Sequence, residues 1–385
     1  MHADPRQDLF NLLEAATQEG VFPGCVALVW TGGAELYHEA HGVLASHAKA
    51  PMRGFKVERS TIYDLASLTK VLSTTTLTAI AVAEGRVDLD SPVPQPWAQA
   101  CPGACLGDLL THSAGLVAHR EYFSAFAGRA PVGAAPILEQ VCRTAPEAPP
   151  GEQTVYSDLG FMILGAWLSR LFDSELDRLF DDRIAWPLGL DRGALPRIGY
   201  HRLNEVRGPS ASEEHRVAPT EVYDPALHQE GEGEPSYFPL RRPTHSAHYE
   251  VHDDNAFAMG GVAGHAGLFG DAETVAEIAR AWLTGGLPGL DSALVRRFWK
   301  PSKIPGSSRR YGFDGTCDGD STGGVFSPAA VGHLGYTGCS LWIDPEPQSA
   351  PRIVVLLSNR VHPRRQNTGI TRLRPAFHRL CAALR

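Results

Sequence analysis

Residues 64–93 read DLASLTKVLSTTTLTAIAVAEGRVDLDSPV, and this stretch decides the fold that we expect. Its part 66–84 predicts a helix that ends at Gly85, because glycine commonly follows the last helical residue. Threonine is a poor helix former, so a helix with this many threonines must be stabilised by burial in a core. Ser67 and Lys70 lie at its start, and side chains three positions apart on a helix share one face within contact distance.

A serine at this place has two interpretations. It can be a helix cap with a solvated lysine three residues later, or it can be a nucleophile. A serine hydroxyl attacks only when a base takes its proton, and a lysine amine can do so where burial or nearby cations lower its pKa. The free N–H groups of a helix N-terminus can also stabilise a developing oxyanion. The motif alone does not decide between the two.

The same Ser-x-x-Lys spacing also occurs at Ser46 and Lys49. There Pro51 and Gly54 follow at once, and both residue types interrupt helices, so no helix can present the two side chains together. Of the two serines, we therefore consider only Ser67 as a nucleophile.

Composition restricts the class of protein. The chain has 385 residues, of which 43% are hydrophobic, and this suits a globular protein with two lobes. Its formal net charge is −8 and its arginines are scattered, so we expect no nucleic-acid partner. No apolar run is long enough to span a bilayer, so we expect no membrane segment.

The first residues of the chain and its cysteines indicate the cellular compartment of the protein. The first residues, MHADP, contain no basic region followed by an apolar one, so no signal peptide is predicted. The seven cysteines are widely spread, and Cys101 and Cys105 have no second pair with which to form a zinc site. We expect a cytoplasmic protein with reduced thiols, or a periplasmic one if a leader has been removed. The oligomeric state is left open.

Hydrophobic patterns place strands near both chain ends and helices between them. Near the N-terminus, a helix over 8–19 precedes the strands GCVALVW and AELYHEAHG, which form a hairpin around 31–33. Near the C-terminus, strands at CSLWID and RIVVLLSN precede a helix over 371–384. The middle has helices at LGDLLTHSAGL, which we expect to close at Gly115, at YSDLGFMILGAWLSRLF and at 271–283.

This order predicts an α+β fold, with a mixed antiparallel sheet built from both chain ends, flanked by helices, and a mostly helical middle lobe. We place the sheet lobe at 1–85 and 265–385 and the helical lobe at 86–264. Residues 199–255 are polar and without periodicity. A loop of this length is commonly a functional lid or insert.

Two further motifs accompany the serine helix. Tyr156, Ser157 and Asp158 stand just before an apolar helix, and HLGYTG at 333–338 stands next to the strand CSLWID. In order and spacing the three motifs resemble those of the serine β-lactamase and penicillin-binding protein superfamily. The resemblance covers roughly residues 20–380 and extends to GRVDLDSPV, LGDLLTHSAGL and GHAGLF. It implies the β-lactamase/transpeptidase-like fold of the class C branch, which includes class C β-lactamases, D-alanyl-D-alanine carboxypeptidases and family VIII carboxylesterases.

The resemblance implies roles for individual residues. Ser67 would be the acylated nucleophile, with Lys70 as its hydrogen-bonded partner. Tyr156 would carry protons to and from the serine and the leaving group, and it would need neighbouring cations to act as a base, because a free phenol has a pKa near 10. Lys70 and His333 are the candidate cations. The backbone N–H groups of Ser67 and Tyr336 would form the oxyanion hole.

Further positions are implied as substrate contacts. The strand with Gly335 would bind substrate backbone by strand addition, which requires no side chain there. Thr337 belongs to the same motif. His265, in GHAGLF, follows glycines in a segment that borders the site in this family, and we include it among the candidates. His112, at the end of a short helix, we interpret as structural.

Two positions depart from the usual pattern of β-lactamases. Asp158 stands where class C enzymes have asparagine, and an ionised carboxylate cannot donate a hydrogen bond to a substrate amide. It would also keep Lys70 charged and leave the work of the base to Tyr156. His333 stands where β-lactamases usually have lysine, and near neutral pH a histidine is only partly charged.

We therefore predict a serine hydrolase that cleaves a small-molecule ester, amide or β-lactam through an acyl-enzyme on Ser67, and that resembles an esterase most. The alternatives are a genuine β-lactamase or D-amino-acid peptidase, or a catalytically silent relative that binds peptidoglycan or a protein. No cofactor and no metal are expected. The motif HEAH at 38–41 we interpret as a hairpin surface, and His245, His248, His252 and Asp253 as members of a polar loop.

Overall fold

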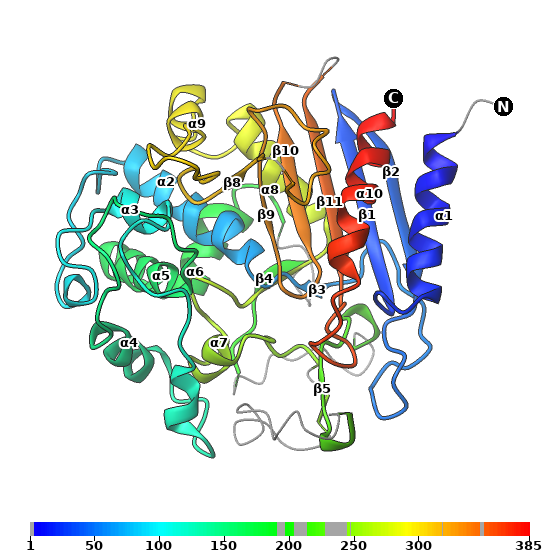
Figure 1. Cartoon of the computed structure of the whole chain (residues 1–385), viewed down its shortest axis with the longest axis horizontal. Helices are drawn as coiled ribbons and strands as arrows, with labels where there is room; N and C mark the ends of the chain where they lie inside the picture. The colour runs from blue at the N-terminus through cyan, green and yellow to red at the C-terminus, as the bar shows by residue number, and fades with distance from the viewer. Residues whose placement is uncertain are drawn as a thin grey trace.

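The computed structural model of the chain describes residues 4–190, 197–203, 214–227, 245–246, 248–317, 319–346 and 350–385. Helices α1 (Pro5–Gln18) and α10 (Ile370–Ala383) pack against each other, so the two ends of the chain lie close together (Figure 1). None of the helices in these ranges is long and apolar enough to cross a membrane.

A six-stranded sheet is built from both ends of the chain. Its strand order is β2-β1-β11-β10-β9-β8, and every neighbouring pair is antiparallel. The strands are β1 (Gly24–Thr31), β2 (Ala34–Gly42), β8 (Asp314–Gly315), β9 (Val331–Leu334), β10 (Ser340–Asp344) and β11 (Arg352–Ser358). The predicted antiparallel sheet, the N-terminal hairpin and the two C-terminal strands are therefore confirmed.

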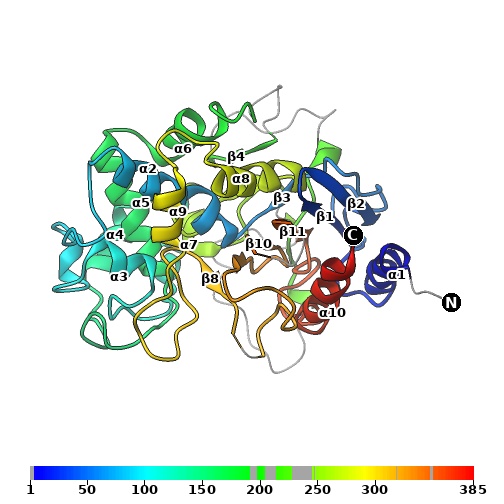
Figure 2. The same cartoon turned by 90° about the horizontal axis from the view of Figure 1, so that it is seen from above.

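Helices cover both faces of this sheet because successive side chains of a strand point to opposite faces. In β1, Cys25 and Ala27 belong to the core that includes α1 and α10. Val26 and Leu28 belong to the larger core, which includes α8 (Ala272–Thr284). Figure 2 shows α8 on one side of the sheet and the two terminal helices on the other.

The remaining helices gather beyond β8 and β9, away from the chain ends (Figure 1). They are α2 (Thr76–Ala83), α3 (Leu106–Leu110), α4 (Ala134–Cys142), α5 (Asp158–Phe172), α6 (Leu176–Phe180), α7 (Asp254–Ala258) and α9 (Ser292–Phe298). Short 3-10 helices are η2 (Trp97–Gln99), η3 (Tyr122–Phe126), η5 (Glu214–Arg216) and η6 (Pro225–Leu227), and η4 (Asp181–Ala185) is π-helical. Two small sheets join β3 (Tyr63–Asp64), β7 (Leu268–Gly270) and β4 (Ile198–Tyr200), and β5 (Val222–Tyr223) and β6 (His245–Ser246).

The helix that follows Ser67 differs from the prediction of one continuous α-helix over 66–84. Ala66 has a φ of 47° and therefore precedes the helix. The residues Lys70–Thr75 form a π-helical segment, η1, and only α2 beyond it is α-helical. A π-helical turn holds one residue more than an α-helical turn, and such turns are frequent at functional sites.

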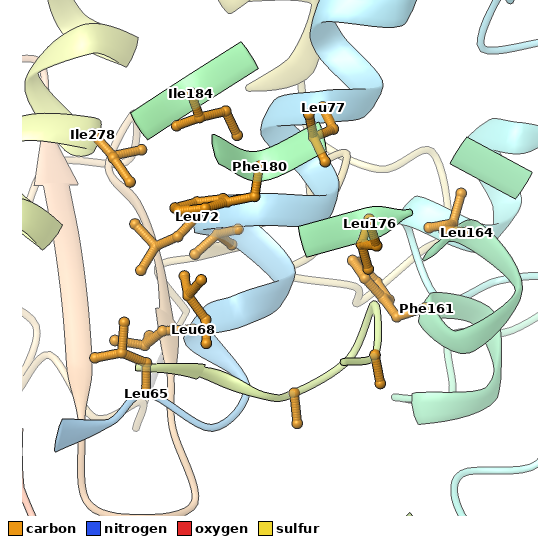
Figure 3. Close-up of a cluster of buried hydrophobic side chains, with 14 of the residues drawn as sticks. Leu65, Leu68, Leu72, Leu77, Phe161, Leu164, Leu176, Phe180, Ile184 and Ile278 are labelled. Atoms are coloured by element: carbon orange, nitrogen blue, oxygen red, sulfur yellow. The ribbon is translucent and has the colours of Figure 1, made fainter. Parts of the chain in front are cut away.

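Burial stabilises this threonine-rich helix, as predicted. The side chains of Thr74, Thr76 and Thr78 are fully buried, and each hydroxyl donates to a backbone carbonyl oxygen at 2.6–2.9 Å. Figure 3 shows the apolar side of the same helix, where Leu68 and Leu72 belong to a cluster that also includes Phe180, Ile278 and their neighbours.

Two details of the sequence-based interpretation are corrected. Helix α3 ends at Leu110 rather than at Gly115, whose φ of 75° lies in the loop beyond it. The 38–41 motif is on strand β2 but is not a surface, because His41 is buried and bonds to Glu14 and Tyr37. Within the polar stretch 199–255, residues 204–213, 228–244 and 247 lie outside the described residues. The boundaries of the two lobes stay a prediction.

Candidate active site

Ser67 lies in a tight turn between strand β3 and the helix η1. The carboxylate of Asp64 fixes this turn, because its Oδ1 accepts from the N–H of Ala66 at 2.8 Å and its Oδ2 accepts from the N–H of His252 at 2.6 Å. Burial raises the pKa of Asp64. The turn exposes the backbone N–H of Ser67, which donates to no acceptor among the described residues.

Lys70 is fully buried beneath Ser67. Its Nζ donates to Ser67 Oγ at 3.0 Å, to Asp158 Oδ1 at 2.8 Å and to the carbonyl oxygen of His265 at 3.1 Å. Burial alone would lower the pKa of Lys70, but the Asp158 carboxylate and the Tyr156 phenol outweigh it and raise the pKa above its ordinary value. Lys70 is therefore an ammonium ion that donates to three acceptors, and it has no free electron pair for the serine proton.

Asp158 is the first residue of α5, where the helix dipole favours a negative charge. Burial alone would raise its pKa, but the charge of Lys70 and the hydrogen bond with His119 outweigh burial and hold the pKa below its ordinary range. The Nδ1 atom of His119 lies 3.4 Å from Asp158 Oδ2, and this contact raises the pKa of His119. His119 lies in a loop, where no sequence pattern indicates a role for it.

Tyr156 stands among two cations and two imidazoles. Lys70 Nζ and Arg309 Cζ each lie 5.0 Å from the centre of its ring. The ring of His112 lies 4.6 Å away and that of His333 lies 5.8 Å away, centre to centre. Burial, together with the charges of Arg309 and Lys70, lowers the pKa of His112 well below its ordinary value, so the cations beside Tyr156 are Lys70 and Arg309.

His333 is a neutral imidazole, which corrects the expectation that it supplies a cation. It is buried in β9, and its Nδ1 donates to the carbonyl oxygen of Leu334 at 2.8 Å. Burial, with the charges of Lys70 and Arg309, lowers its pKa to about 3. The sequence could not show this, because it requires the burial and the two cations that only the fold brings to His333.

Tyr336 forms an exposed wall above Ser67. Half of its surface is exposed, and its ring lies between the guanidinium of Arg360, at 4.2 Å, and the ring of His252, at 5.7 Å. Arg360 Nε also donates to the carbonyl oxygen of Tyr336 at 2.6 Å. Within the described ranges the N–H of Tyr336 donates to no acceptor, so both N–H groups that the resemblance implies for an oxyanion hole are unoccupied.

Two cavities of about 350 Å³ each meet at Ser67, Tyr156 and Tyr336, which line both. The acidic cavity is also lined by Ala66, His119, Glu121, Phe123, Asp158, His252, Asp253, Asp254, Ala266 and Arg365. The arginine cavity is also lined by Arg309, Asp314, His333, Leu334, Gly335, Arg360, Thr368, Ile370, Thr371 and Arg374. The nucleophile therefore faces one cavity rich in carboxylates and one rich in guanidinium groups.

The other candidate residues support the walls. A Cβ atom on Gly335 would lie 2.7 Å from the carbonyl oxygen of Leu65, so glycine lets this segment approach the serine turn closely. Thr337 is buried and donates to the carbonyl oxygen of Asp64 at 2.7 Å. His265 is buried, and its Nε2 lies 2.9 Å from Asp253 Oδ1. Thr337 and His265 line neither cavity, whereas Gly335 lines the arginine cavity.

The histidines of the polar loop have protein partners. His252 Nε2 lies 3.0 Å from Glu221 Oε2, and His248 Nε2 lies 3.1 Å from the carbonyl oxygens of Glu214 and Val217. Among the described residues, no group of three or more His, Cys, Asp or Glu side chains could hold a metal ion.

The fold and this constellation define a serine hydrolase. The family model for Beta-lactamase matches residues 9–376, and the chain belongs to that family. A protein of Escherichia coli O157:H7 named "Putative D-alanyl-D-alanine carboxypeptidase" is 29% identical over 371 residues, which cover 89% of this chain and 79% of that protein. A protein of Salmonella paratyphi A with the same name is 30% identical over 325 residues, which cover 79% and 70%.

Solved structures show the same fold. EstCE1, described as a hydrolase with promiscuous acyltransferase activity, has a TM-score of 0.68 at 19% identity, with coverage of 96% of this chain and 98% of that chain. Unliganded simvastatin synthase LovD from Aspergillus terreus has a TM-score of 0.71 at 16% identity, with coverage of 99% and 98%. The predicted β-lactamase/transpeptidase-like fold is thereby confirmed, and the chain is a β-lactamase-family serine hydrolase.

Proposed function

We propose that the chain hydrolyses small acyl compounds through an acyl-enzyme on Ser67, and that esters are its preferred substrates. The observation that carries this proposal is the contact of Ser67 Oγ with a buried, charged Lys70 that is itself held by Asp158. A serine that only capped a helix would not need a buried ammonium ion beneath its hydroxyl.

In this proposal Tyr156 is the base. Lys70 is already protonated, and the two cations beside Tyr156 can stabilise negative charge on its phenol oxygen. As a phenolate, Tyr156 takes the proton of Ser67 while Oγ attacks the substrate carbonyl, and the N–H groups of Ser67 and Tyr336 stabilise the oxyanion. Tyr156 then protonates the leaving group, and the same residue activates the water that releases the acyl group from Ser67 Oγ.

The preference for esters rests on Asp158. Its carboxylate is held ionised and accepts from Lys70 and His119, so it offers no N–H donor to an amide oxygen of a substrate. A substrate without an amide near the scissile carbonyl loses nothing there.

A carboxypeptidase activity on small D-peptides is the second candidate. The arginine cavity favours it, because Arg309, Arg360 and Arg374 line that cavity together with a single carboxylate, Asp314. Three guanidinium groups against one carboxylate leave a net positive charge that attracts the carboxylate of a peptide C-terminus. The names of the bacterial relatives agree with this candidate.

A fluorophosphonate probe tests the proposal. After incubation, mass spectrometry should find one adduct, on Ser67, and Ser67→Ala should abolish both the adduct and the hydrolysis of nitrophenyl butyrate. Ser46→Ala is the matched control and should change neither. Unlabelled wild-type protein would instead mean a silent binding protein. Comparison of nitrophenyl butyrate with nitrocefin and a D-alanyl-D-alanine peptide then separates the two candidate activities.

A further inference from the structure

His112 has an unusual backbone conformation just after helix α3. Its φ is 56°, in the left-handed region that favours glycine. The N–H of Ser113 donates to the carbonyl oxygen of Asp108 at 2.8 Å, and the N–H of His112 donates to that of Leu109 at 3.3 Å. These are the two bonds of a Schellman motif, in which glycine is the usual residue at this position. A histidine there is the more strained choice, and it indicates that the side chain has a role.

His112 holds the chain on both sides of Tyr156. Its carbonyl oxygen accepts from the N–H of Val155 at 2.9 Å, and its Nδ1 atom accepts from the N–H of Ser157 at 3.0 Å. Tyr156 itself belongs to neither a helix nor a strand, since α5 begins at Asp158. No regular element fixes the backbone of Tyr156, and these two bonds therefore do so.

The imidazole of His112 also packs on the phenol ring. The ring centres of His112 and Tyr156 lie 4.6 Å apart, and the ring of Phe161 lies 5.2 Å from that of His112. His112 is buried and lines neither of the cavities that meet at Ser67. It therefore does not touch a substrate in these cavities, and its route to the reaction is through Tyr156.

The bond to Ser157 fixes the tautomer of His112. A backbone N–H only donates, so Nδ1 must be the unprotonated nitrogen and Nε2 must carry the hydrogen. Within the described part of the chain this Nε2 hydrogen has no acceptor. A buried donor without a partner costs free energy, and an apolar side chain would pack here without that cost. What the histidine adds is the acceptor for Ser157.

We propose that His112 is a positioning residue of the reaction, whose Nδ1 atom aims the phenol of Tyr156 at Ser67 by accepting from the N–H of Ser157. This inference rests on the proposed function, in which Tyr156 is the base. Proton transfer requires the phenol oxygen to come within hydrogen-bond distance of Ser67 Oγ. A misplacement of about 1 Å can slow a reaction about 100-fold, so a residue that fixes Tyr156 affects the rate without contact with the substrate.

Two substitutions separate the hydrogen bond from the packing. In His112→Asn the side-chain oxygen takes the place of Nδ1 and can accept from Ser157, and asparagine tolerates the left-handed conformation. In His112→Gln the polar atoms lie near the position of Nε2 instead, so the bond to Ser157 is lost. If His112→Gln does not fold, His112→Gly takes its place, because glycine also lacks the acceptor and adopts the left-handed conformation without strain.

Steady-state hydrolysis of nitrophenyl butyrate by the full chain gives the result. Rates are expressed per Ser67 that the fluorophosphonate labels, so unfolded protein is not counted. We expect kcat to fall about 10–100-fold in His112→Gln, with KM within about twofold of wild type because the cavity walls are intact. In His112→Asn, which keeps the acceptor, kcat should stay within about fivefold of wild type.

His362 provides the matched control. It is also a buried histidine, and its Nε2 atom accepts from the N–H groups of Ser46 and His47 at 3.3 and 3.2 Å. It lines neither cavity at Ser67. His362→Asn removes this acceptor and should leave kcat per labelled Ser67 unchanged.

A second background shows whether His112 acts through Tyr156. In Tyr156→Phe the phenol is already lost, so His112→Gln should cause no further fall of kcat. A fall as large as in the wild-type background would overturn the inference, because His112 would then act on the fold or on another residue. Equal losses in His112→Asn and His112→Gln would also overturn it, since packing rather than the Nδ1 acceptor would be responsible.

The proposed function can fail separately. If the fluorophosphonate adduct forms on Ser67 and Tyr156→Phe is slow, but His112→Gln has the wild-type kcat, this inference fails and the proposed function stands. If no adduct forms on Ser67, the proposed function itself fails.

Discussion

The Nζ atom of Lys70 lies 2.8 Å from Oδ1 of Asp158, and the lysine is fully buried. Burial alone would lower the pKa of Lys70, but the Asp158 carboxylate and the Tyr156 phenol together outweigh it, so the proton stays on the lysine. Lys70 thus donates a hydrogen bond to Ser67 rather than accepting its proton. A buried ion pair of this kind also makes each partner necessary to the other, since either charge alone would be stranded in the core.

Replacement of Asp158 by asparagine should raise activity on amide-bearing substrates relative to esters. The variant returns an N–H donor to the site and removes the counter-charge of Lys70, whose pKa should then fall because only the Tyr156 phenol still opposes the effect of burial. We expect the ratio of kcat/KM for nitrocefin over nitrophenyl butyrate to rise about fivefold, which corresponds to about 1 kcal/mol. Asp177→Asn, which breaks an ion pair with Arg202, is the control. An unchanged ratio in Asp158→Asn would contradict this role.

Lys70→Ala and Tyr156→Phe should each lower kcat/KM by about 10²–10⁴, the range typical of a positioned acid–base group. Because both residues act on the same proton of Ser67, the double variant should be little slower than the slower single variant. Steady-state kinetics on nitrophenyl butyrate measure this. Losses that add in the logarithm of the rate would mean that the two residues work independently.

Arg360 should position Tyr336 for catalysis. Its guanidinium stacks on the ring of Tyr336 and its Nε holds the carbonyl of the same residue. We expect Arg360→Met to lower kcat/KM about 10–100-fold, less than the loss of an oxyanion donor itself. Added guanidinium chloride at low concentration should restore part of kcat. Arg364→Met, which removes a bond to the carbonyl of Leu227, is the control. If guanidinium chloride does not restore kcat, and kcat/KM falls only in proportion to the fraction of folded protein, then Arg360 has a structural role.

The preference for anionic over neutral substrates should not change between pH 5.5 and 9. His333, with a pKa of about 3, stays neutral over this whole range, and the guanidinium groups of the cavity stay charged. The ratio of kcat/KM for nitrocefin over nitrophenyl butyrate should therefore be flat. His333→Lys adds a cation and should raise the ratio about fivefold, or about 1 kcal/mol. A wild-type ratio that falls as the pH rises through 6.5 would show that His333 is charged after all.

A fall in pH should lower the free energy of unfolding already at pH values above those at which the carboxylates become protonated. Burial lowers the pKa of both His362 and His378 to about 4, against about 6.5 in the unfolded chain. Between these values the unfolded chain binds protons that the folded chain does not, so the free energy of unfolding falls as the pH drops. Each histidine should contribute about 1.4 kcal/mol per pH unit there.

Urea unfolding at pH 7, 6 and 5 measures this slope. His378→Phe should make it shallower by the share of one histidine, and His215→Gln, at an exposed position, should leave it unchanged. Equal slopes in wild type and His378→Phe would contradict the assignment.

Much of the fold was predictable because its signals are local. Strands β1 and β11 have long apolar runs that end at turn residues, and α5 and α8 have uniform helical patterns. The spacing of Ser67 and Lys70, together with two distant motifs, was enough to predict a site, and the structure brings these residues together. Such features depend on neighbours in sequence, or on motifs that keep their order along the chain.

The rest depends on the folded environment. The neutral state of His333 follows from burial beside Lys70 and Arg309, and no sequence pattern records burial of a strand residue by distant cations. Arg309 and His119 reach the site from loops, where side-chain direction has no periodicity. Asp158 was predicted to hold Lys70 charged because the chemistry of that pair needs only their contact, which the resemblance already implied.

The π-helical turn at Lys70–Thr75 has a consequence for how the nucleophile is aimed. One surplus residue in the turn rotates everything before it by about 100° relative to an unbroken α-helix. The residues before the π-helical turn, which include Ser67, and the apolar residues after it are thus rotated relative to each other about the helix axis. The cavity fixes the orientation of the first part, and the core fixes that of the second. Deletion of one residue within 71–75 would give a more regular helix with its core side intact, and it would swing the serine hydroxyl away from Tyr156. The π-helical turn therefore allows one helix to bury its apolar side chains in the core and to direct Ser67 into the cavity.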